Sequence, residues 1–373
     1  MASAETSSSS SSSSGDRARI RIKRLAKQVQ AEPRFGRPAY PSVVFEETKD
    51  LDGLRSSIVV IGASVLDVHL TCEAAIPAST VPGKIAFQHG GVGRNIVECL
   101  GRLKQRPLFI SAVGHDAAGR EILSAMEDLG VPTRGVKVCT GSTTSVVACS
   151  FDESGNLTSG VADTALLERE LTKGWVVTFQ RDIECAKLLV LEANLTAEIL
   201  EFCFEIASKA GVPVFFEPVS VSKSVRIVPF LSKVSYMSPN EAELKAIAAA
   251  ASGQSNRSDV ANDTQCLHSL GVKNVLVTRG KDGCQISIQG GRELMLPSLN
   301  VRVINVNGAG DCLVAGTLKA LVENNLHSLE YAVSYGIAVA CAAIQSASNV
   351  PEIKSTSEID ADALHVFSRR ISM

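Results

Sequence analysis

The sequence predicts a three-layer α/β fold in which helices cover both faces of a mostly parallel central sheet and a small β-sheet forms a lid. Short apolar runs alternate with helical segments along most of the chain, and this alternation is typical of a parallel sheet buried on both faces. Two segments, Val65–Gln88 and Val136–Thr158, interrupt the alternation because they are rich in β-branched residues and lack a helical period.

The elements of the large sheet begin near Ser57, where residues 58–62 read IVVIG, a short buried strand ending in glycine. We expect a helix over 116–129 that Asp116 caps at its N-terminus and Gly130 at its C-terminus. The other predicted strands span 107–113, 188–191, 212–216, 234–237, 274–278 and 301–306, and the other predicted helices span 93–105, 310–323 and 327–345.

The two β-rich segments are expected to pair into the lid, formed by about residues 65–90 and 136–160. The lid would stand over the C-terminal edge of the large sheet, which is where open α/β sheets bind ligands. The folded domain is therefore predicted to span 57–373, preceded by an N-terminal segment at 1–56.

The N-terminal segment contains an unbroken serine run, Ser7–Ser14, followed by a basic stretch over 17–27. It cannot join a packed core, so we expect either a disordered tail or an organelle-targeting segment. The acidic residues Glu5 and Asp16 favour the tail, because targeting segments are poor in acidic residues. The compartment is intracellular by expectation, either cytoplasmic or organellar.

Composition excludes several classes of partner. The 373 residues carry a net charge of -2 and no clustered basic face, so nucleic acid is not an expected partner. No apolar stretch approaches the roughly 20 residues that cross a bilayer. Ten cysteines without a CxxC pair predict free thiols in a reducing compartment rather than disulfides or a zinc site. A small-molecule ligand is the remaining expectation.

The strongest chemical signal is residues 307–316, NGAGDCLVAG, which open an amphipathic helix. Small residues let backbone N–H groups approach a phosphate, and the helix N-terminus adds partial positive charge. Asp311 in the first turn could accept a proton from an attacking hydroxyl, while Gly308, Ala309 and Gly310 stabilise the transferred group. An ordinary glycine-rich turn, with Asp311 serving the helix dipole, fits these residues equally well.

A second signal is residues 90–95, GGVGRN, just before a predicted helix. A dinucleotide fingerprint is a weak interpretation, because Ile96 stands where the third glycine belongs. Gly90 and Gly91 would instead admit a sugar, and Asn95 offers both a donor and an acceptor to vicinal hydroxyls.

Together, and in this order, the two motifs resemble the paired signatures of the pfkB or ribokinase-like family of carbohydrate kinases over about residues 57–350. The resemblance implies a ribokinase-like fold, ATP and Mg²⁺, with Asp311 as catalytic base and residues 308–310 as the anion hole. It also implies that Asp67 binds sugar hydroxyls, although a surface carboxylate on a lid strand is the simpler alternative.

Two more segments match the family. Asn240 and Glu243 resemble its N-x-x-E motif, which organises magnesium and phosphate through water; a capped helix N-terminus fits the same residues. The nucleotide-binding turn T-x-G-x-x-G is matched by Thr278, Gly280 and Gly283, for which a plain β-turn is the alternative.

The substrate is indicated by residues 81–96, which resemble the pseudouridine kinases of the family and include Lys84. The segment 216–220, FEPVS, is similar to theirs as well. Glu192 and Asn194 fall where those enzymes carry an acidic-x-Asn segment facing the sugar, although strand-end capping is nearly as good an interpretation. The resemblance implies transfer of the ATP γ-phosphate to the 5'-hydroxyl of pseudouridine, in nucleoside degradation. Ribose, adenosine and fructose kinases stay open, as does a non-catalytic family member acting as an interaction protein.

One departure concerns a monovalent cation. Many family members have Asp-Thr where this chain has Asn305-Val306, and asparagine keeps a carbonyl ligand but loses the charge. The resemblance therefore leaves a K⁺ requirement in doubt. Finally, an uncovered apolar sheet face on the lid predicts a homodimer that forms through the lid.

Overall fold

Two β-sheets organise the residues that the computed structural model describes, which are 56–72, 79–152, 157–253, 259–323, 328–353 and 355–372. The chain divides into two units, Met1–Leu51 and Asp52–Met373, and every described residue belongs to the second. Our expectations for the serine run and the basic stretch therefore lie outside the described residues. Among the described residues, no helix has both the length and the apolar character needed to cross a bilayer.

The large sheet has ten strands among these residues, in the order β14-β13-β12-β11-β10-β9-β8-β1-β4-β5. Pairing is parallel from β5 to β11 and antiparallel from β11 to β14, so the predicted mostly parallel sheet is confirmed. The strands are β1 Ile58–Ile61, β4 Leu108–Gly114, β5 Val136–Cys139, β8 Leu188–Glu192, β9 Val214–Glu217, β10 Tyr236–Met237, β11 Asn274–Thr278, β12 Cys284–Ile288, β13 Glu293–Leu296 and β14 Ile371–Ser372.

Helices cover both faces of this sheet, and β1 shows why. Its residues alternate between two cores: Ile58 and Val60 belong to one hydrophobic cluster, Val59 and Ile61 to the other. The first cluster includes residues of α2 Val92–Arg102, α3 Ala117–Asp128, α11 Ala309–Glu323, α12 Leu329–Ile344 and α13 Thr356–Ser368. The second includes residues of α4 Leu166–Glu170, α5 Lys173–Val177, α6 Gln180–Glu184, α7 Ala197–Ala210, the 3₁₀ helix η1 Val225–Lys233, α9 Glu241–Ser252 and α10 Val260–Ser269. The remaining short helices are α8 Val221–Ser224 and η2 Gly280–Asp282.

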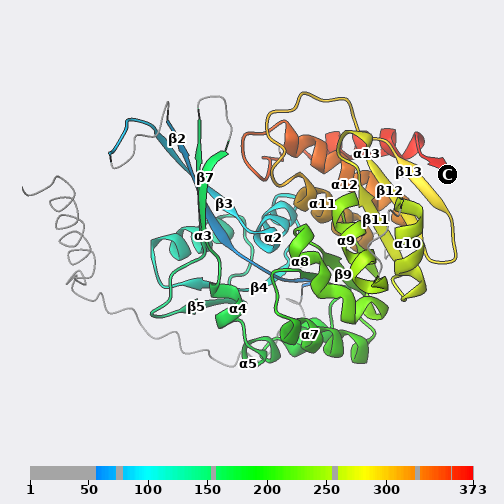
Figure 1. Cartoon of the computed structure of the whole chain (residues 1–373), viewed down its shortest axis with the longest axis horizontal. Coiled ribbons are helices and arrows are strands. Elements are labelled where there is room, and N and C mark those ends of the chain that lie inside the picture. Colours follow the sequence, from blue (N-terminus) through cyan, green and yellow to red (C-terminus); the bar gives the residue numbers. More distant parts are fainter. Residues whose placement is uncertain are drawn as a thin grey trace, which may run out of the picture. The chain divides into compact units, whose positions relative to one another are not determined.

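The lid is a separate four-stranded sheet in the order β3-β2-β6-β7 (Figure 1). Its strands are β2 Val65–Thr71, β3 Lys84–Gly90, β6 Val146–Phe151 and β7 Leu157–Asp163. Directly opposed residues share a face of a sheet. Asp67 is opposed to Gln88 and Val147, whereas its neighbour Val68 is opposed to Phe87 and Ala148. Asp67 and Phe87 therefore lie on opposite faces of the lid.

Part of our lid prediction was wrong. Residues 136–139 form β5, which pairs in parallel with β4 through Ser111 and Val136 at the edge of the large sheet. The segment has the β-branched residues of a lid strand, but residue type does not determine which of two sheets a short strand joins. The second half of the lid begins at Val146 instead.

The predicted strand over 301–306 is absent from the structure of these described residues. The backbone N–H groups of Ile304 and Asn305 donate to the carbonyl of Ile344 at the end of α12, at 2.7 and 3.2 Å. These N–H groups find their acceptor at a helix end, so the segment needs no strand partner. The other predicted elements agree with the observed ones to within a few residues, and β11 matches the prediction in full.

Asp116 caps α3 as predicted and also joins the helix to the lid. Its Oδ1 accepts from the backbone N–H of Gly119 (2.8 Å), and Gly130 adopts φ 68° just beyond the helix. The same carboxylate accepts from the backbone N–H and the hydroxyl of buried Thr144, at 2.7 and 2.6 Å. Thr144 lies just before β6, so one side chain fixes both the helix start and the entry to a lid strand.

We predict that Asp116→Ala lowers the free energy of unfolding by at least about 1–2 kcal/mol, because the helix loses its cap and Thr144 loses its acceptor. Urea unfolding followed by circular dichroism measures this loss. Asp128→Ala is the matched control, since Asp128 is an exposed carboxylate at the other end of α3. Equal midpoints for the two variants would contradict this account of Asp116.

Candidate active site

Asp311 lies in the first turn of α11, beside a tight approach of two backbone segments. Gly308 has φ 74°, and a Cβ atom at this position would lie 2.2 Å from the carbonyl oxygen of Asn349. Only glycine fits there, which lets the chain turn directly into the helix. The first N–H groups of a helix lack partners within it, and space is open around Gly310. The helix start is therefore suited to an anion.

The two glycine-rich motifs meet at a hydrogen bond between buried side chains. The Nδ2 of Asn95, on α2, donates to Oδ2 of Asp311 at 2.8 Å. Burial raises the pKa of Asp311 to about 7, while the bond from Asn95 and the charge of Arg94 oppose this rise. A carboxylate with such a pKa can accept a proton near neutral pH.

Asp67 lies against the glycine pair that precedes α2. A Cβ at Gly90 would lie 2.1 Å from Oδ2 of Asp67, so glycine is what allows the carboxylate to pack on the backbone here. Burial raises the pKa of Asp67, and the charges of His69 and Arg94 counteract it. The charge of Arg94 thus acts on both Asp67 and Asp311.

The other predicted acceptor residues have different contacts. Gly91 is the N-cap residue of α2. Lys84 is exposed and opposed to Thr71, so it shares a lid face with Asp67 but lies at the far end of the strand. Glu192 is fully buried; it accepts from the N–H of Ala63 (2.7 Å), and burial raises its pKa to about 7. These contacts match the alternative role given in the sequence analysis, in which Glu192 caps the end of a strand.

Asn194 also takes part in that capping arrangement. Its backbone N–H and its side-chain amide both donate to Glu192, and its Oδ1 accepts from Nζ of Lys223 at 2.5 Å. The structure therefore joins Asp67 to Gly90 and Asn95 to Asp311. The carboxylate of Glu192 is instead bonded to Ala63 and Asn194.

A cavity of about 650 Å³ connects the predicted nucleotide turn to the start of α11. Thr278, Gly280 and Gly283 line one side, and Ala309 and Gly310 line another. Sequence reasoning did not find the rest of the wall, which is largely apolar and is formed by Lys281, Ser298, Leu299, Asn300, Val301, Val303, Val306, Leu313, Ile337, Ala340, Cys341 and Ile344. Lys281 and Leu313 lie within the quoted motifs, and Val306 follows Asn305. The other residues belong to loops and helix faces without a motif, so no local signal identified them.

Asn240 and Glu243 form a capping box at the start of α9. The N–H of Glu243 donates to Oδ1 of Asn240 (2.9 Å), and the N–H of Asn240 donates to Oε2 of Glu243 (3.0 Å). This is the helix-cap alternative of the sequence analysis. Asn240 also forms a parallel bridge with Thr278, which places the capping box beside the nucleotide turn.

Glu217, at the end of β9, is an acidic residue whose part in this region the sequence did not reveal. It accepts from the hydroxyl of Ser238, and burial together with the carboxylates of Asp311 and Glu243 raises its pKa well above the ordinary value. Among the described residues, no group of three or more His, Cys, Asp or Glu side chains is arranged to hold a metal. The oxygen groups of Asn240 and Glu243 nevertheless suit Mg²⁺, which takes oxygen ligands and keeps several waters.

Asn305, the position that put a monovalent cation in doubt, uses its side chain within the protein. Its Oδ1 accepts from the N–H of Asn307 (3.0 Å), and its Nδ2 donates to the carbonyl of Ala347 (3.2 Å). The amide oxygen that could serve a cation thus already has a donor.

Comparisons with known proteins agree with this geometry. The family model described as pfkB family carbohydrate kinase matches residues 55–354. A pseudouridine kinase of Arabidopsis thaliana is 30% identical over 368 residues, which cover 83% of this chain and 96% of that protein. A pseudouridine kinase of Escherichia coli (strain K12) is 30% identical over 288 residues, covering 77% of this chain and 89% of that protein.

Solved structures show the same fold. Arabidopsis thaliana ribokinase, in complex with ribose and ATP, aligns with a TM-score of 0.72 and 22% identity, covering 84% of this chain and 99% of that one. A sugar kinase from Clostridium perfringens aligns with a TM-score of 0.72 and 23% identity, covering 86% and 98%. The chain therefore belongs to the pfkB family of carbohydrate kinases and has the ribokinase-like fold.

Proposed function

We propose that this protein is an ATP-dependent kinase that transfers the γ-phosphate to the 5'-hydroxyl of pseudouridine, giving pseudouridine 5'-phosphate in nucleoside degradation. The observation that carries the proposal is the hydrogen bond between Asn95 and Asp311. This pair lies at the start of α11, next to the nucleotide cavity, and Asp67 shares its guanidinium neighbour Arg94. The two relatives named as pseudouridine kinases support the choice of acceptor.

The proposed reaction is an in-line phosphoryl transfer in which Asp311 accepts the proton of the acceptor hydroxyl. Its pKa of about 7 makes it a usable base near neutral pH. The N–H groups of residues 308–310 would stabilise charge on the transferred group, and positioning would supply most of the catalysis. Bound to the phosphates of ATP, Mg²⁺ supplies neutralising charge; Asn240 and Glu243 would hold it through water.

The acceptor sugar would lie between the lid and α2. Asp67 and Asn95 can hydrogen-bond its vicinal hydroxyls. Gly90 and Gly91 let the backbone that precedes α2 pack closely against Asp67 and the segment before β2. Closure of the lid over the sugar would exclude water, which is a competing phosphate acceptor. Lys84, at the far end of lid strand β3, would contact the acceptor only after such a closure. Asn194 follows β8 of the large sheet and would approach the acceptor from that side.

The experiment that tests the proposal is a panel of acceptors with ATP: pseudouridine, uridine, ribose, adenosine and fructose. We expect pseudouridine to give the highest kcat/KM, measured by coupled detection of ADP. A higher value for ribose, adenosine or fructose would assign another substrate within the family. No ADP formation with any acceptor would favour a non-catalytic member that acts as an interaction protein.

We predict that Asp311→Asn lowers kcat by about 100- to 10,000-fold, because the amide cannot accept the hydroxyl proton. Binding of ATP and of nucleoside, measured by calorimetry, should stay within a few-fold of wild type. Asp362→Asn on α13 removes an exposed carboxylate outside the site and serves as the control. Near-normal turnover of Asp311→Asn would exclude Asp311 as the base.

We also propose that the protein forms a homodimer through the lid face opposite Asp67. Ile85, Phe87 and Val161 on this face are 64, 67 and 74% exposed, and exposed apolar sheet surface tends to be buried by a partner. A second copy offers the same apolar face, so the contact would be self-complementary.

Light scattering over a range of concentrations tests this assembly. We expect a dimer for the wild type and a shift toward monomer for Phe87→Asp, because the charge would be buried without a partner. Ala86→Asp is the matched control, since Ala86 is exposed on the other lid face. A monomeric wild type, or equal effects of both variants, would reject the lid as the dimer interface.

A further inference from the structure

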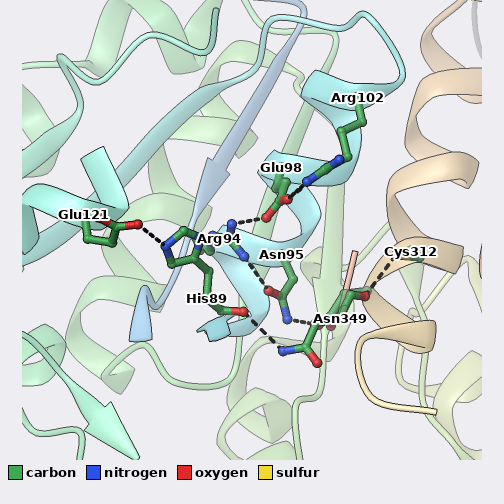
Figure 2. A network of polar contacts seen from close by, with 9 residues as sticks. His89, Arg94, Asn95, Glu98, Arg102, Glu121, Cys312 and Asn349 are labelled. Carbon is green, nitrogen blue, oxygen red and sulfur yellow. Dashed lines mark hydrogen bonds and ion pairs between the residues drawn. The ribbon is translucent and has the colours of Figure 1, made fainter. Parts of the chain in front are cut away.

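Arg94 is a buried cation that the proposed reaction does not use. It is 2% exposed and lies in the first turn of α2, between the glycine motif and Asn95. Its Nη1 donates to Oδ1 of Asn95 at 3.2 Å, and its Nη2 forms an ion pair with Glu98 (Figure 2). The guanidinium therefore contacts the residue that contacts the proposed base.

The contact with Arg94 determines which end of the Asn95 amide faces Asp311. An asparagine side chain has one oxygen that accepts and one nitrogen that donates. Because Oδ1 of Asn95 accepts from Arg94, its Nδ2 is directed at Oδ2 of Asp311. The opposite orientation would place the amide oxygen against the carboxylate and the amide N–H₂ against the guanidinium, and both contacts are repulsive.

A purely stabilising role explains this arginine poorly. Glu98 already has a second partner, Arg102, whose Nε and Nη2 donate to its Oε1 at 2.9 and 2.6 Å. The Nε of Arg94 finds no hydrogen-bond partner among the described residues. Burial lowers the pKa of Arg94 to about 9, and buried ion pairs seldom add net stability.

We propose that Arg94 is a positioning residue, which locks the amide of Asn95 in the orientation that keeps Asp311 ionised and aimed at the acceptor hydroxyl. This inference rests on the proposed function for its catalytic meaning. The carboxylate of Glu98 would in turn hold the guanidinium in place along α2.

The charges around Asp311 give the sign of the effect. On α2 it faces Arg94, whose charge favours the ionised carboxylate, and Asn95, which donates to it. Glu217 on β9 is a neighbouring carboxyl whose own pKa is raised by burial and by Asp311, and the thiol of Cys312 follows Asp311 on α11. On β2, the charges of His69 and Arg94 both act on Asp67. Removing Arg94 leaves the effect of burial opposed only by the hydrogen bond from Asn95, so the pKa of Asp311 rises.

We predict that Arg94→Met shifts the acidic limb of the kcat profile to higher pH by about one pH unit, because a neighbouring cation favours the carboxylate. On that limb kcat should fall about tenfold below wild type, and the deficit should shrink as the pH rises and Asp311 ionises. The KM for ATP should stay within about twofold of wild type. A loss that is equal at every pH would instead indicate a structural role and would overturn the inference.

Three further variants separate positioning from folding. Arg102 also pairs with Glu98, but the donor to Asn95 is Arg94. Arg102→Met should therefore keep the wild-type pH profile. Arg94→Lys should move the limb part of the way back, because it restores the charge. If Arg94→Met does not fold, the double variant Arg94→Met/Glu98→Gln removes both charges of the pair and is expected to show the same shift.

A readout without substrate distinguishes this inference from the proposed function. Carboxyl-¹³C-labelled aspartate NMR follows the titration of Asp311, and the Asp311→Asn variant assigns its signal. The midpoint should be higher in Arg94→Met than in wild type. If wild type phosphorylates no acceptor, the proposed function fails and the titration still tests Arg94; an unchanged midpoint in a folded variant overturns the role of Arg94.

Discussion

One buried hydrogen bond, from Asn95 to Asp311, links the two halves of the candidate site. It joins α2, which continues directly from lid strand β3, to α11, which begins beside the nucleotide cavity. The two helices also pack through apolar side chains in the same core, so the bond is formed within a rigid contact. The distance between lid and phosphate cradle therefore depends on helix packing more than on loop geometry.

Burial of the site makes it costly to keep its carboxyl groups charged. Asp67, Glu217 and Asp311 all have pKa values raised by burial, which disfavours their charged forms. A fold tolerates such a cluster where nearby cations compensate, and Arg94 is the buried cation that acts on both Asp67 and Asp311. In the proposed reaction, the network of α2 in Figure 2 would therefore serve the acid-base chemistry as well as the helix.

Local signals predicted the local structure. The cap at Asp116, strand β11 and the helix opening at Asp311 each depend on neighbouring residues, and each was found from the sequence. Long-range choices were not accessible. Strand β5 has the residue types of a lid strand but joins the large sheet. Helix α3 connects β4 to β5, and this connection brings β5 back beside β4 whatever side chains β5 carries.

The site residues show the same division. Asp67, Asn95 and Asp311 lie in motifs, and the structure brings them into one region. The apolar wall of the nucleotide cavity comes from loops and from α12, where apolar side chains look like ordinary core residues. Glu192 occupies a motif position, yet its carboxylate is fully buried and bonded to Ala63. A sequence motif identifies which residue stands at a given position, but it does not predict which way the side chain of that residue points.

Direction also determines how the lid works. In a strand pair, a shift by one residue exchanges the two faces of the whole strand. Here the register of β2 on β3 places Asp67 on one face of the lid and Phe87 on the opposite face. Gly90 is compatible with this register, because a side chain there would collide with the carboxylate of Asp67. The same glycine precedes α2, so lid register, helix start and the orientation of Asn95 are set within one short stretch of chain.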